Sequence, residues 1–88
     1  MPKFTPPAKM RDLIEALIDN QWAFAVTHGT DTGGSPFATV EGRTEKHHIV
    51  ATWHTRVAGT YRLFSALHNK RDATLMQILH IVNGATDA

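Results

Sequence analysis

Histidines and cations crowd into one stretch of this chain, residues 43–71. The stretch holds six of the nine Lys and Arg residues and four of the six histidines, which are His47, His48, His54 and His68. Its single acid is Glu45, so its formal charge is +5, whereas the remaining residues, three cations against seven acids, carry −4. A concentrated positive field suits a polyanion, because each neutralised phosphate releases a condensed counterion. The composition therefore predicts a nucleic-acid partner, RNA in particular. The plainer alternative is the solvated side of a sheet with acidic helices.

Two adjacent histidines, His47 and His48, begin the most strand-like run, which we expect over residues 47–54. Neighbouring side chains in a strand point to opposite faces of the sheet. One face then carries His48, Val50, Thr52 and His54, and the other carries His47, Ile49, Ala51 and Trp53. Burial favours the Ile49 and Trp53 side as the core face. His47, at the end of the strand, still reaches solvent there.

A histidine among cations can act as a base, because neighbouring positive charge disfavours the imidazolium and leaves neutral imidazole near pH 7. Cleavage of RNA through its 2′-hydroxyl needs such a base, together with a cation for the charge that develops on phosphorus. The alternative is a histidine exposed on a polar strand. Whether the chain is an enzyme stays open. If it is one, the pattern predicts a metal-independent endoribonuclease that uses a strand histidine.

Six histidines in 88 residues also raise the question of a metal. A site would need His47 or His48 to meet His54 and His68, with a carboxylate such as Glu45. However, no two histidines have the i, i+4 spacing of a helical ligand pair, and the absence of cysteine excludes thiolate sites and disulfides. We expect neither a metal nor a cofactor.

Hydrophobic periodicity places a helix at each end of the chain. The spacing of Met10, Leu13 and Leu17 predicts a helix over residues 6–19, with Thr5 as its N-cap. A second helix should follow Asp72 as its N-cap and end before Gly84. The tail, residues 85–88, is expected to fray.

Strands are expected between these helices. Alternation predicts strands at residues 22–26, 37–43, 47–54 and 60–68, with Gly42 as a bulge or turn residue. On the last strand Arg62, Phe64, Ala66 and His68 should share one face. Turn formers make residues 28–36 a Gly-rich loop. The aromatic residues Trp53, Tyr61 and Phe64 are candidates to stack on bases, although core or edge packing is the commoner role.

The order is helix, three or four antiparallel strands, helix. Both amphipathic helices must bury their apolar stripes on one face of the sheet. We therefore expect a single α+β domain over residues 1–88, a two-layer sandwich of the double-stranded-RNA-binding-domain kind. No apolar run approaches a membrane span, and residues 1–7 lack the apolar core of a secretory signal. A cytoplasmic protein with no membrane partner is expected.

The run His47-His48-Ile49-Val50 resembles the Gly-Ser-His-His-hydrophobic stretch of HicA-type mRNA interferases. The strand ending in His68-Asn69-Lys70, followed by Thr74-Leu75-Met76-Gln77-Ile78-Leu79, is similar to that family's strand, His-bearing loop and helix. The resemblance implies a dsRBD-like fold, His47 (alternatively His48) as the catalytic residue and a HicB-type antitoxin as partner. It also implies a set of RNA contacts, namely Lys46, Arg62, His68, Lys70 and Arg71.

Two departures from the family pattern leave other functions open. Glu45-Lys46 replaces the family's Gly-Ser, and residues 27–44 form an extra segment. The alternative function is a non-enzymatic protein of the phage-encoded or regulatory type, which uses the same fold to bind a host protein. A sheet edge at residues 37–43 would also allow a homo-oligomer.

Overall fold

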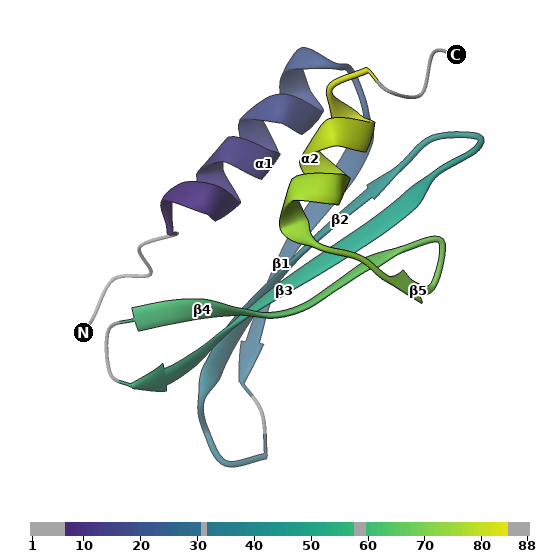
Figure 1. Cartoon of the computed structure of the whole chain (residues 1–88). Coiled ribbons are helices and arrows are strands. Elements are labelled where there is room, and N and C mark those ends of the chain that lie inside the picture. The colour runs from purple at the N-terminus through teal and green to yellow at the C-terminus, as the bar shows by residue number, and fades with distance from the viewer. Residues whose placement is uncertain (1–6, 31, 58–59, 85–88) are drawn as a thin grey trace.

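The computed structural model describes residues 7–30, 32–57 and 60–84, and it leaves the side chains of residues 55–57, 60 and 61 undescribed. Two helices and five strands follow one another along the chain (Figure 1). They are α1 (Ala8–Asp19), β1 (Ala23–Thr30), β2 (Pro36–Arg43), β3 (His48–Val57), β4 (Thr60–His68), β5 (Arg71–Asp72) and α2 (Leu75–Val82).

The strands form one antiparallel sheet in the order β1-β2-β3-β4-β5. Both helices lie on the same face of this sheet (Figure 1). The predicted α+β class is confirmed. One helix precedes the antiparallel sheet in the sequence, the other follows it, and both pack on it as a second layer. The short strand β5 is an addition that periodicity did not indicate. No helix among the described residues has the length and apolar character needed to cross a membrane.

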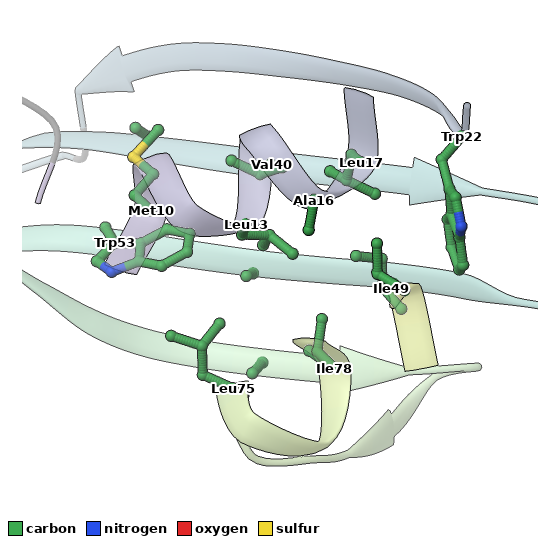
Figure 2. Close-up of a cluster of buried hydrophobic side chains, with 14 residues drawn as sticks. Met10, Leu13, Ala16, Leu17, Trp22, Val40, Ile49, Trp53, Leu75 and Ile78 are labelled. Atoms are coloured by element: carbon green, nitrogen blue, oxygen red, sulfur yellow. The ribbon is translucent and has the colours of Figure 1, made fainter. Parts of the chain in front are cut away.

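The core lies between the helices and the sheet (Figure 2). Met10, Leu13 and Leu17 of α1 and Ile78 of α2 are fully buried against it. On the sheet side, the fully or almost fully buried residues include Ala38, Val40, Ile49, Ala51 and Trp53. The prediction that Ile49 and Trp53 face the core is therefore confirmed, and His48, Val50, Thr52 and His54 point to the open face.

Both helices begin two residues later than predicted. Pro7 is the N-cap of α1, without a side-chain hydrogen bond, and the predicted cap Thr5 lies outside the described residues. In α2, Thr74 is the N-cap: its Oγ1 accepts from the Gln77 N–H at 3.0 Å, and Gln77 Oε1 accepts from the Thr74 N–H at 2.9 Å. The predicted cap Asp72 is wrong because this residue is held in β5. Gly84 has φ 119° just after the C-cap, as predicted.

Two glycines let side chains approach the sheet closely. The predicted loop at 28–36 is too long, since β1 continues to Thr30 and β2 begins at Pro36. Gly29 pairs with Phe37 there, and a Cβ on Gly29 would lie 2.8 Å from Cζ of the Phe37 ring. Gly42 is not a bulge: it pairs regularly with Ile49, and a Cβ on it would lie 2.8 Å from Cδ2 of Leu17. Gly42 therefore allows α1 to sit close to β2.

A bulge occurs instead between β3 and β4, where the register shifts at Thr52/Trp53. Before the shift, Ala66 and His68 pair with Ala51 and Ile49 and face the helices. After it, the ring of Phe64 lies 5.7 Å from that of His54, on the open face. The predicted common face of Arg62, Phe64, Ala66 and His68 is therefore wrong, because the extra residue in β4 reverses the alternation.

The predicted sheet edge at residues 37–43 is also wrong. Strand β2 pairs with β1 on one side and β3 on the other. The edges of the sheet are β1 and β5.

Candidate nucleic-acid interface

Two turns meet at one end of the sheet and are joined by Asn69. Its Oδ1 accepts from the His48 N–H at 2.8 Å, and its Nδ2 donates to the Lys46 carbonyl at 3.3 Å. Its backbone N–H donates to the His48 carbonyl at 2.7 Å. The β2–β3 turn and the β4–β5 turn are therefore held as one unit. We call the group Lys46, His47, His68, Lys70 and Arg71 the basic end.

The β4–β5 turn presents a lysine in an unfavourable backbone conformation. His68 pairs with Arg71, and the two residues between them have positive φ, 51° at Asn69 and 69° at Lys70. This is the pattern of a two-residue type I′ hairpin, which prefers Asn-Gly. Asn69 suits its place, whereas Lys70 occupies the glycine position, where a side chain costs about 1–2 kcal/mol. The turn thus places an exposed cation where glycine would be more stable.

The β2–β3 turn is closed by Thr44. Its Oγ1 accepts from the backbone N–H groups of Lys46 at 3.3 Å and His47 at 3.0 Å. The Thr44 N–H also donates to the His47 carbonyl at 2.8 Å. The exposed Lys46 is therefore carried on an ordered turn beside the Lys70 turn.

The central feature of the basic end is a pair of histidines. Nδ1 of His47 and Nε2 of His68 lie 2.8 Å apart, with ring centroids 5.0 Å apart, and Trp22 stacks on His47 at 6.2 Å. One of the two nitrogens must donate and the other accept. Since an imidazolium carries protons on both nitrogens, this hydrogen bond requires at least one neutral ring.

Burial lowers the pKa of His68 below its ordinary value, and the positive charge of His47 lowers it further. His68 also lines a depression of about 350 Å³ with Arg71 and His80, and His47 lines a second one of about 230 Å³ with Lys46. Each histidine of the pair therefore lines a depression together with a cation and a carboxylate, which is Asp72 in the first and Glu45 in the second. A neutral imidazole in that position can accept a proton from a bound group.

The adjacent His48 lies on the opposite face. Its Nε2 is 2.5 Å from Oε2 of Glu41, and Arg43 lies 3.4 Å from the same oxygen. The hydrogen bond from His48 is the main reason why the pKa of Glu41 is lowered. His48, the alternative catalytic residue, is therefore hydrogen-bonded to Glu41 on the open face.

The histidines do not converge as a metal site would require. His47 and His68 meet on the helix side, His48 faces the open side with Glu41, and His54 lies further along β3 against Phe37 and Phe64. Among the residues that the structure describes, no group of three His, Cys, Asp or Glu side chains is placed to hold a metal ion.

Five of the predicted RNA and catalytic residues thus come together as the basic end, whereas Arg62 and the alternative catalytic residue His48 lie on the open face. Arg62 is in register with His54 on the open face. Sequence reasoning missed Asn69, although Asn after a strand is a turn signal, and it missed Trp22, for which no local pattern exists. Tyr61 lies outside the described side chains. Trp53 belongs to the core, being 2% exposed, so it is not available to stack on a base.

Comparison with protein-family models, curated proteins and solved structures finds no match for this chain. The resemblance to HicA-type interferases stays a prediction, which depends on residues 47–50, 68–70 and 74–79.

Proposed function

We propose that this chain binds RNA at the basic end and cleaves it with the His47–His68 pair, without a metal. The observation that carries the proposal is the 2.8 Å contact between Nδ1 of His47 and Nε2 of His68, among exposed cations. Lys46 and Lys70 belong to the two turns that Asn69 joins, and Arg71 follows in β5.

Binding depends on Lys46, Lys70 and Arg71, which are all exposed. Since the turns are ordered before RNA arrives, little conformational entropy is lost when their cations meet phosphates. Each contact with a phosphate should steepen the slope of log affinity against log salt concentration by about one. The affinity should therefore fall steeply as the salt concentration rises.

Cleavage follows from a neutral imidazole beside those cations. His47 takes the proton of the RNA 2′-hydroxyl and shares the resulting charge with His68. The 2′-oxygen then bonds to phosphorus and the bond from phosphorus to the 5′-oxygen breaks. The leaving oxygen takes a proton from the imidazolium or from water. The products are a 2′,3′-cyclic phosphate and a 5′-hydroxyl, and the nearby cations stabilise the charge on phosphorus.

The resemblance to HicA-type interferases supports the same assignment, because it gives His47 the catalytic role and Lys46, Lys70 and Arg71 the phosphate contacts. A HicB-type antitoxin is the corresponding proposed partner. It would have to cover the basic end to inhibit the reaction.

The test measures binding and cleavage separately, with a fluorescein-labelled RNA at several salt concentrations. We expect binding that weakens with salt and cyclic-phosphate products that disappear in His47→Ala, while that variant still binds. Affinity that does not depend on salt would contradict the interface. RNA that is bound but not cut by the wild type would contradict the nuclease and leave the binding function in place.

A second candidate, a protein-binding module, is favoured by strand β1. This edge strand of eight residues contains no Lys, Arg, Asp or Glu, and Phe24 on it is 37% exposed. Edge strands without charge are open to pairing with a strand from another chain. The first partner to test is a second copy. Sedimentation equilibrium should show dimers that Ala25→Lys dissociates, and a wild-type monomer would count against self-pairing.

A further inference from the structure

We infer that the open face of the sheet carries a stacking platform for an unpaired nucleobase, formed by Phe37, His54 and Phe64 with Arg62 beside them. The inference rests on the proposed RNA function and deepens it, since it makes single-stranded RNA the preferred substrate. It concerns a surface on the opposite face from the His47–His68 pair.

Three neighbouring strands each contribute one ring to the platform. Phe37 of β2 and His54 of β3 are paired in register, and their ring planes are parallel to within 1° at a centroid distance of 6.4 Å. Phe64 of β4 continues the row, with its ring 5.7 Å from His54 and tilted by 41°. Phe64 reaches this face through the bulge at Thr52/Trp53. Bulges often redirect a side chain in this way beside functional sites.

Gly29 supports the Phe37 ring from the edge strand. The two residues are paired, and a Cβ on Gly29 would lie 2.8 Å from Cζ and 3.1 Å from Cε1 of that ring. The ring therefore rests against the bare backbone of β1, where any side chain would displace it.

The outer ring is open to solvent. Phe64 is 64% exposed, whereas the large aromatic residue Trp53 on the core face is 2% exposed. An exposed phenyl ring contributes little to the stability of the isolated protein, and it offers an apolar surface to a ligand. Stacking of one base on such a ring raises affinity by roughly tenfold or more.

The charges at this place favour a nucleotide as the occupant. Arg62 is exposed and is in register with His54, so it offers a phosphate contact next to the rings. On the same face, the acid Glu41 is already engaged by His48 and Arg43. His48 and His54 are six residues apart on β3, about 20 Å at the rise of a strand. A single strand that crosses this face would need only a few nucleotides to run from the platform toward the basic end.

The experiment compares two RNA decamers that carry the same phosphates, oligoadenylate and an abasic strand, by fluorescence anisotropy; both are 2′-O-methylated, so that the proposed cleavage cannot occur during the measurement. The variants are Phe64→Ala and Gly29→Ala, and the matched control is Met76→Ala. Met76 is also an exposed apolar side chain, 80% exposed, but it lies on α2. Urea unfolding of each variant checks that the fold is kept.

We expect oligoadenylate to bind the wild type roughly tenfold more tightly than the abasic strand. Phe64→Ala should remove most of that difference, Gly29→Ala part of it, and Met76→Ala none. Equal affinity for the two decamers, or a difference that survives Phe64→Ala, would overturn the platform and leave RNA binding at the basic end in place. If neither decamer binds, both the platform and the proposed function fail. Binding that depends on Phe64 but not on Lys46 or Lys70 would keep the platform and overturn the basic end.

Discussion

His47 and His48 are neighbours of identical chemistry in opposite environments. His47 stacks on Trp22 and shares a hydrogen bond with His68 under the helices, whereas His48 pairs with Glu41 on the open face. His48 begins β3 and points to the open face, whereas His47 is the last residue of the turn before it and points to the other side, as the alternation of side chains along an extended chain predicts. One face thus acquires an imidazole pair that favours a neutral ring, and the other an imidazole held by a carboxylate.

The largest expected effect separates these two histidines. His47→Ala should lower the rate of RNA cleavage by about 10²–10⁴-fold, the usual contribution of a general base. His48→Ala should change it by only a few fold, because His48 lies on the other face. Single-turnover cleavage by saturating protein measures the chemical step. Equal losses in the two variants would mean that the two faces do not differ in function.

A second comparison uses one glycine on each face. Gly42→Ala should lower the free energy of unfolding by about 1–3 kcal/mol, because its Cβ would meet Leu17, Ile49 and Trp22 within a packed core. Gly29→Ala should cost less, since the phenyl ring that it meets can swing outward toward solvent. Urea unfolding measures both. A larger cost at Gly29 would show that the open face is the more rigid one.

Lys70→Gly distinguishes a functional from a structural role of the basic end. Glycine relieves the positive φ of 69°, so the free energy of unfolding should rise by about 1 kcal/mol. The same change removes a cation, so RNA affinity should weaken. The slope of log affinity against log salt concentration should become shallower by about one, the contribution of one phosphate contact. Lys70→Arg is the control that keeps the charge. A variant that is more stable and binds RNA as tightly as the wild type would remove Lys70 from the interface.

The smallest expected effect concerns pH. Because the pKa of His68 in the folded chain lies below its ordinary value of 6.5, the unfolded chain takes up this proton more readily. The free energy of unfolding should therefore fall as the pH drops below 6.5, and this contribution should level off below the lower, folded pKa. The groups around His68 are His47, Arg71, Asp72 and His80. Thermal melts between pH 8 and pH 5 should show a weaker dependence in His68→Gln. If His68→Gln shows the same pH dependence as the wild type, groups other than His68 cause the loss of stability at low pH.

Much of the fold could be predicted because it depends on local periodicity. The apolar stripes of Met10, Leu13 and Leu17 and of Ile78 and Val82 determine which sides of the helices are buried. Alternation along β3 predicted that His47 and His48 would separate and that Ile49 and Trp53 would be buried. The errors fall at places without a periodic signal, namely the start of α2 at Thr74, the length of the β1–β2 connection and strand β5.

The candidate site was predictable only in its residue types. Histidines and cations in residues 43–71 indicated a basic surface, and five of the predicted residues do meet at one end of the sheet. Arg62 does not, because it lies six residues before His68 on β4, about 20 Å at the rise of a strand, and the bulge also places it with His54 and Phe64 on the other face. The adjacent apolar residues Leu63 and Phe64 interrupt the alternation in β4 where the bulge occurs, but a second such pair, Ala66 and Leu67, has no bulge, so the pattern alone does not locate it.

By itself, the sequence determined two amphipathic helices, a sheet with opposite faces at His47 and His48, and a positive segment in the second half of the chain. Those properties depend on spacings of two to four residues, which the backbone geometry converts directly into faces. Only the tertiary structure decided that His47 meets His68, that Asn69 joins the two turns, and that Phe37, His54 and Phe64 form one row. Such contacts join residues 10 to 23 positions apart, or more. They depend on the hydrogen-bond register of neighbouring strands, which turns, bulges and core packing set together.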